Sequence, residues 1–154
     1  MNFEKVLSQI YLKSPLQKKK LMRYFEDQPS SFFEEAETFI REYSDYLNSK
    51  NIPFDYAIDA YLKMCKDMVK SQIYFIKNDK YPLESQEQAF NDVYDSKNEM
   101  QSYMIGLALS QYLWSTHYEM FNHLKKTIQE NGKNIKSYLE IGPGHGLFLK
   151  EAIK

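Results

Sequence analysis

Cysteine is nearly absent from this sequence, and its scarcity excludes several kinds of site. Among 154 residues the single cysteine, Cys65, permits neither an intrachain disulfide nor a cysteine-based metal site. The three histidines lack the spacing of a metal-binding helix, so no metal is expected. The first residues also lack the charged-then-apolar order of an export signal. Together these absences predict a protein of the reducing cytoplasm.

The sequence also lacks an excess of either positive or negative charge. The formal net charge is −1, which argues against the basic surface that nucleic-acid binding requires. The one basic cluster, Lys18-Lys19-Lys20 with Arg23, stands beside acidic residues and is typical of a solvated helix face. The uncharged stretch 100–118 holds too many polar residues for a membrane helix, which needs about 20 predominantly apolar ones. We therefore expect neither nucleic acid nor a membrane as a partner.

Aromatic residues, by contrast, are abundant, with 13 tyrosines and ten phenylalanines. A hydrophobic content of 43% is sufficient for a folded domain with a core. Before about residue 134, apolar residues recur at spacings of three and four, which predicts a helical domain. The expected helices cover residues 3–13, 14–27, 31–50, 53–77 and 98–130, and a short helix fits within 86–94 of the loop-like stretch 78–97.

Several residues mark where these helices begin and end. Ser14-Pro15 supplies an N-cap and a first-turn proline. Ser31 and Glu34 have the spacing of a capping box, which predicts a helix start at Ser31. Asn131-Gly132 is a natural helix stop, after which the chain leads into a different kind of segment.

That segment contains three of the five glycines in the chain, at positions 142, 144 and 146. A short apolar stretch, Tyr138 to Ile141 with Glu140 within it, precedes them, and a helix start follows. Strand, glycine-rich turn and helix in this order are typical of a nucleotide-binding crossover, in which glycines let the backbone approach a ligand. The pattern is G-x-G-x-G. It is neither the dinucleotide fingerprint, since position 147 is leucine, nor a P-loop, since G-K-[S/T] is absent.

Residues 138–146 resemble motif I of the class I S-adenosylmethionine-dependent methyltransferases, which is a hydrophobic strand, an acidic residue, an aliphatic residue and G-x-G-x-G. The resemblance implies S-adenosylmethionine as cofactor, with a loop that wraps its methionine and ribose portions. It also implies that Glu140 lies near the cofactor's amino group or braces the loop. The cofactor-binding residues implied in this way are Glu140, Gly142, Pro143, Gly144 and Gly146.

The fold expected on this basis is mainly α. Residues 1–133 form an N-terminal helical domain, and residues 134–154 form the first strand and helix start of a truncated Rossmann-like α/β domain. The acidic residue that holds the cofactor ribose would lie about 20 residues further on. We therefore expect the N-terminal part of a longer methyltransferase, inactive by itself, whose acceptor is a small molecule.

Two other interpretations remain open. One is a helical interaction or dimerisation module with a vestigial glycine loop, and the other is a nucleotide-binding protein of another Rossmann-like type. A lone strand leaves its backbone groups unpaired, so residues 137–142 are expected to pair between two copies in a homo-oligomer.

The helix expected over 98–130 is apolar nearly all round between Tyr103 and Tyr118, so other elements should cover it. In methyltransferases with an added helical region, such helices often cover the active site. Tyr103 and His117 carry polar atoms and are therefore candidate cofactor-binding residues, whereas Trp114 is expected in the core. His145 is not expected to be catalytic. No nucleophile–base pair can be identified, so no catalytic residue is predicted.

Overall fold

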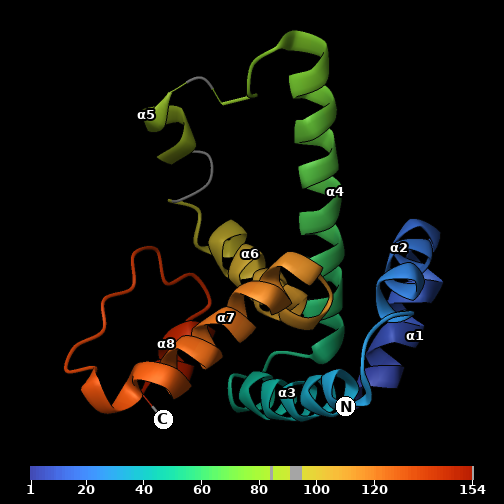
Figure 1. Ribbon diagram of the computed structural model, residues 1–154. Coiled ribbons are helices and arrows are strands. Elements are labelled where there is room, and N and C mark those ends of the chain that lie inside the picture. Colours follow the sequence, from blue (N-terminus) through green and yellow to red (C-terminus); the bar gives the residue numbers. More distant parts are fainter. Residues whose placement is uncertain (84, 91–94, 154) are drawn as a thin grey trace.

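The computed structural model describes residues 1–83, 85–90 and 95–153, and this part of the chain is mainly helical, as predicted (Figure 1). The first four helices lie close to their expected positions, with bounds that differ by at most about two residues. The elements are α1 (Phe3–Lys13), α2 (Pro15–Phe25), α3 (Ser30–Ser49), α4 (Phe54–Asn78), α5 (Gln86–Ala89), α6 (Lys97–Leu109), η2 (Ser110–Tyr112), α7 (Ser115–Asn131), η3 (Gly132–Asn134) and α8 (Leu147–Ala152). Residues 91–94 of the short helix expected over 86–94 lie outside the described residues.

Some helix boundaries follow local side-chain chemistry. The Ser14 hydroxyl accepts a hydrogen bond from the backbone N–H of Gln17, which is the expected cap of α2. The capping box predicted at Ser31 is wrong. The helix α3 begins one residue earlier, Pro29 is its N-cap, and no side chain caps it. Ser31 therefore lies inside the first turn, where its hydroxyl cannot act as the cap.

The prediction of a single helix over 98–130 is also wrong, because the α-helix is interrupted between Leu109 and Ser115. Two buried polar side chains bond to backbone carbonyls at the break: the Ser110 hydroxyl to Leu107 at 2.6 Å, and the Gln111 amide to His117 at 2.9 Å. Such bonds compete with the regular helical pattern. Trp114 then adopts an extended conformation, with φ −125° and ψ 125°, and α7 begins at the next residue.

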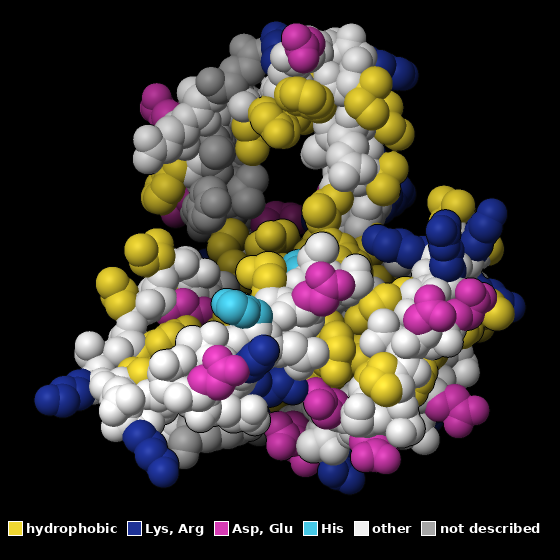
Figure 2. All heavy atoms as spheres, viewed as in Figure 1, with side chains coloured by type: hydrophobic (Ala, Val, Ile, Leu, Met, Phe, Trp, Pro, Cys, Tyr) yellow, Lys and Arg dark blue, Asp and Glu magenta, His cyan; other side chains and the backbone are white. Residues whose placement is uncertain are grey.

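The helix α4 is the longest element and projects beyond the others, as Figure 1 shows. One face of its first half is buried, whereas its second half carries exposed apolar side chains that are visible in Figure 2. These are Met68, Val69, Ile73, Phe75 and Ile76.

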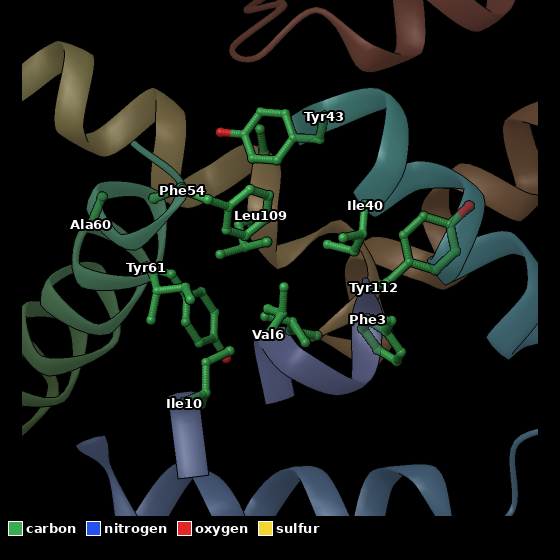
Figure 3. Packing of buried hydrophobic residues seen from close by; sticks show 14 of the residues in the cluster. Phe3, Val6, Ile10, Ile40, Tyr43, Phe54, Ala60, Tyr61, Leu109 and Tyr112 are labelled. Atoms are coloured by element: carbon green, nitrogen blue, oxygen red, sulfur yellow. The ribbon is translucent and has the colours of Figure 1, made fainter. Parts of the chain in front are cut away.

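The core lies where α1, α3, α4 and α6 meet, and Figure 3 shows its side chains directed toward one another. Two buried tyrosines supply the polar links across it. The Tyr43 hydroxyl donates to the carbonyl of Ile105 at 2.9 Å and joins α3 to α6. The Tyr61 hydroxyl donates to Gln17 at 3.1 Å and accepts from the Trp114 indole at 3.2 Å, which joins α4 to α2 and to the start of α7.

The helices α4 and α6 form the most extensive pair, and Gly106 lies at their crossing. A Cβ atom at Gly106 would stand 2.8 Å from the carbonyl carbon and oxygen of Ala60, closer than packed atoms approach. The lack of a side chain therefore allows the two backbones to come into direct contact.

The first strand of a Rossmann-like domain, predicted over Tyr138–Ile141, is not seen. Residues 135–140 have no regular secondary structure, and Leu139 and Ile141 are highly exposed. A strand is stabilised by ladder hydrogen bonds to a neighbouring strand, and the described residues contain no second strand that could supply them. The apolar pattern of this segment is thus present without the sheet that it would require.

Candidate functional site

The glycine loop, residues 142–146, has a backbone conformation that only glycine adopts readily. Gly142, Gly144 and Gly146 have φ values of 70°, 52° and 73°, all in the left-handed region. A turn closes the loop, with the N–H of Gly146 donating to the carbonyl of Pro143 at 2.8 Å. Gly146 then forms the N-cap of α8. All three glycines of the motif are therefore required by geometry, for a loop that passes directly into a helix.

The space around the three glycines differs. Beside Gly142 and Gly146 no heavy atom of the described structure lies within 4 Å of where a Cβ would stand. At Gly144 a Cβ would meet the Leu107 side chain of α6 at 3.4 Å. The middle glycine therefore faces the helical domain, whereas the outer two border open space that could admit a ligand.

The helical domain holds the glycine loop and α8 through polar and aromatic contacts. The Lys150 ammonium is 2.8 Å from a carboxylate oxygen of Glu42 and links α8 to α3. The rings of Phe148 and Phe121 lie 5.6 Å apart and link α8 to α7. Both Lys150 and Glu42 are about half exposed, so the ion pair orients the helix more than it stabilises the fold.

A cavity of about 430 Å³ lies between the glycine loop, α3 and α6. Its wall on α3 is aromatic: Phe39, Tyr43 and Tyr46 follow one another with stacked rings, at centroid distances of 5.5 Å and 6.3 Å. None of these residues was predicted from the sequence to be a site residue. Their spacing of three and four was assigned to the helix alone, and nothing local to α3 indicates that a loop about a hundred residues later lies opposite.

Glu140 is the acidic residue of the motif and is partly buried beside the loop. Within the described residues, its buried Oε2 atom has no hydrogen-bond partner. Burial and the nearby Glu140 carboxylate raise the pKa of the Tyr138 hydroxyl. A buried carboxylate oxygen without a donor is costly, so it marks a place where a donor from a ligand or another segment would be favourable.

His145 lies inside the loop and takes part in its structure. Its Nδ1 atom accepts a hydrogen bond from the backbone N–H of Leu147 at 3.1 Å, at the start of α8. Burial, and to a lesser extent the charge of His117, lower the pKa of His145 to about 4. The imidazole is therefore neutral near pH 7, and its Nδ1 lone pair remains available to the backbone N–H of Leu147.

The other two candidates from the sequence, Tyr103 and His117, do not line the cavity beside the glycine loop. Tyr103 belongs to a cavity of about 650 Å³ between α4 and α6, where Met64 and Phe75 are among its neighbours. His117 lines a third cavity, at the start of α7. The residues of the motif itself, from Glu140 to Gly146, lie together as contiguous sequence must.

The described residues contain no group of three or more His, Cys, Asp or Glu side chains placed to hold a metal ion. Nor does any helix in the described ranges have the length and apolar character needed to cross a membrane. Comparison with protein-family models, with curated proteins and with solved structures gives no match to this chain.

Proposed function

We propose that this chain is the N-terminal part of an S-adenosylmethionine-dependent methyltransferase. The observation that carries the proposal is the loop of Gly142, Gly144 and Gly146, in which every glycine has a positive φ and the last one begins a helix. An ordinary turn before a helix needs one glycine with a positive φ. Three such glycines at alternate positions expose a curved backbone that can follow a ligand. The cytoplasmic location inferred from the sequence is part of this proposal.

The environment of the loop leaves room for a cofactor. Gly142 and Gly146 border open space, and the Oε2 atom of Glu140 lacks a donor within the described residues, which suits a ligand that carries N–H or O–H groups. Leu139 and Ile141 are 83% and 90% exposed. A parallel sheet in the rest of a methyltransferase domain would bury such apolar side chains. Glu140, Gly142 and Gly146 would therefore hold the cofactor, and Gly144 would hold the loop against α6.

When bound, the cofactor would supply an electrophilic methyl group for an acceptor nitrogen, oxygen or carbon atom. This chain would contribute positioning, since the loop backbone fixes one end of the ligand. The aromatic wall of Phe39, Tyr43 and Tyr46 favours a small organic acceptor over a nucleic acid, because rings bury apolar surface and bring no positive charge.

A helical interaction module is the second candidate, and the exposed apolar half of α4 favours it. Met68, Ile73 and Ile76 lie on a projecting helix where a partner could cover them. Pairing of residues 137–142 between two copies would also bury Leu139 and Ile141. Sedimentation of residues 1–154 and of residues 1–134 tests this pairing. If the pairing is correct, the longer chain associates and the shorter chain remains monomeric.

The reading frame beyond codon 154 separates the two candidates. A methyltransferase requires a second strand that ends in Asp or Glu about 20 residues after the loop, where the ribose hydroxyls would bind. An immediate stop codon would contradict the methyltransferase and favour the interaction module.

Calorimetry with S-adenosylmethionine, on the protein expressed from its complete reading frame, tests the cofactor directly. Gly142→Val should weaken binding about five- to thirty-fold, since a side chain in the left-handed region costs about 1–2 kcal/mol and occupies the ligand's space. Gly132→Ala is the matched control, because Gly132 has a φ of −53° and lies outside the loop. Absence of binding by the unmodified protein, or equal affinity in Gly142→Val, would refute the assignment.

A further inference from the structure

A separate cavity of about 410 Å³ lies at the start of α7, between that helix, α2 and α4. Its volume is within the range of small-molecule sites in proteins. The side chains that matter for its chemistry are Lys20 from α2, Cys65 from α4, and Trp114 and His117 from the start of α7. Neither the glycine loop nor the proposed methyl transfer involves it.

The protonation state of His117 follows from its bond with Ser110. The Ser110 hydroxyl lies 2.6 Å from the carbonyl oxygen of Leu107 and 2.7 Å from Nδ1 of His117. A hydroxyl has one proton, and a carbonyl can only accept, so Ser110 donates to Leu107. The bond to His117 then requires that Nδ1 carries the proton and donates it to Ser110. Ser110 is completely buried, so water cannot supply an alternative partner.

This arrangement leaves Nε2 of His117 with a lone pair in the neutral ring, and within the described residues Nε2 makes no hydrogen bond. Burial lowers the pKa of His117, which keeps the ring neutral near pH 7. The titratable groups around it are Lys20 and Cys65 in the cavity wall and His145 in the glycine loop. None of them is a carboxylate that could favour the imidazolium.

The remaining wall combines aromatic rings with one positive charge. The Lys20 ammonium lies 5.5 Å from the centre of the Trp114 ring, and the rings of Trp114 and His117 are 4.8 Å apart. In the described part of the chain, no Asp or Glu lines the cavity. A ligand oxygen that carries partial negative charge is therefore favoured, as is a planar ring that can lie against the indole.

We infer that this cavity is a binding site for a small planar ring that carries a hydroxyl group, of the phenol class, with His117 Nε2 accepting the hydroxyl proton in a hydrogen bond. Trp114 contacts the ring, and Lys20 stabilises the hydroxyl oxygen. A carboxylate on the same ring is disfavoured, because it has no proton to offer and its oxygens would face the Nε2 lone pair.

Phenol is the probe for this site, and Trp114 is the reporter because it is the only tryptophan in the chain. Titration of the 154-residue protein with phenol, with excitation selective for tryptophan, should produce a saturable change in emission. Anisole has the same ring and no hydroxyl proton, so it should bind about five- to ten-fold more weakly, the value of one hydrogen bond. Benzoate should bind more weakly than phenol.

Nitrogen-15 spectra of the histidine rings test the proton assignment independently. Nδ1 of His117 should carry the proton in the free protein, and the Nε2 resonance should move upfield as phenol binds. Ser110→Ala should weaken phenol binding, whereas His123→Gln, at an exposed position, should leave it unchanged. A proton on Nε2, equal affinity for phenol and anisole, tighter binding of benzoate, or no saturable change in emission would each overturn the inference.

Discussion

Gly106→Ala tests whether α4 and α6 are held in backbone contact. The added methyl group would stand 2.8 Å from the carbonyl carbon and oxygen of Ala60 and 2.9 Å from the backbone nitrogen of Tyr61. All three atoms belong to the α4 backbone, so none can rotate away as the end of a flexible side chain could. The two helices must separate, and the surrounding core must adjust with them.

The expected magnitude is the difference between two effects. Overpacking of a core costs about 1–3 kcal/mol, and contact with backbone belongs at the upper end of that range. Alanine is intrinsically better than glycine inside a helix by about 1 kcal/mol, which offsets part of the cost. The net loss of unfolding free energy should be about 2 kcal/mol. For a chain of this length, this corresponds to a fall in Tm of about 4–8 °C.

Urea and thermal unfolding, followed by circular dichroism, measure this loss. Gly132→Ala is again the matched control, since its Cβ would meet only the Ile128 side chain at an ordinary 3.8 Å. That variant should be as stable as the original protein or slightly more so. If Gly106→Ala has unchanged or increased stability, the close crossing of α4 and α6 is refuted.

Two further perturbations follow from the buried polar groups. Tyr61→Phe should lower the unfolding free energy by about 1–3 kcal/mol in urea titrations, because Gln17 and the Trp114 indole both lose their hydrogen-bond partner. Stability equal to that of the original protein would show that these bonds contribute nothing. Folding lowers the pKa of His145 to about 4, so the unfolded chain binds a proton at this histidine more readily than the folded chain does. The unfolding free energy should therefore fall as the pH decreases from about 6.5 to 4. Because His145 is partly exposed, the loss should be about 1–2 kcal/mol. His145→Gln should flatten this dependence, and an identical pH profile in that variant would contradict it.

Local sequence was sufficient to predict the mainly helical class and most helix boundaries. The residues involved act on their immediate neighbours: Ser14-Pro15 caps α2, and the apolar spacing within α3 and α4 sets the face that each helix buries. The glycine loop was identifiable for the same reason, since a positive φ at Gly142, Gly144 and Gly146 is a property of each residue and its turn.

Interactions between distant segments were decided only by the tertiary structure. The break at residues 110–114 depends on where buried Ser110 and Gln111 find partners, and no periodicity records this. The strand expected at residues 138–141 failed because a strand needs a neighbour, which local pattern cannot supply. Likewise, the aromatic wall of α3 faces the glycine loop only because α8 packs on α7 and pairs with α3. Local propensity thus determined the elements of this protein, whereas long-range packing determined which of its surfaces became cavities.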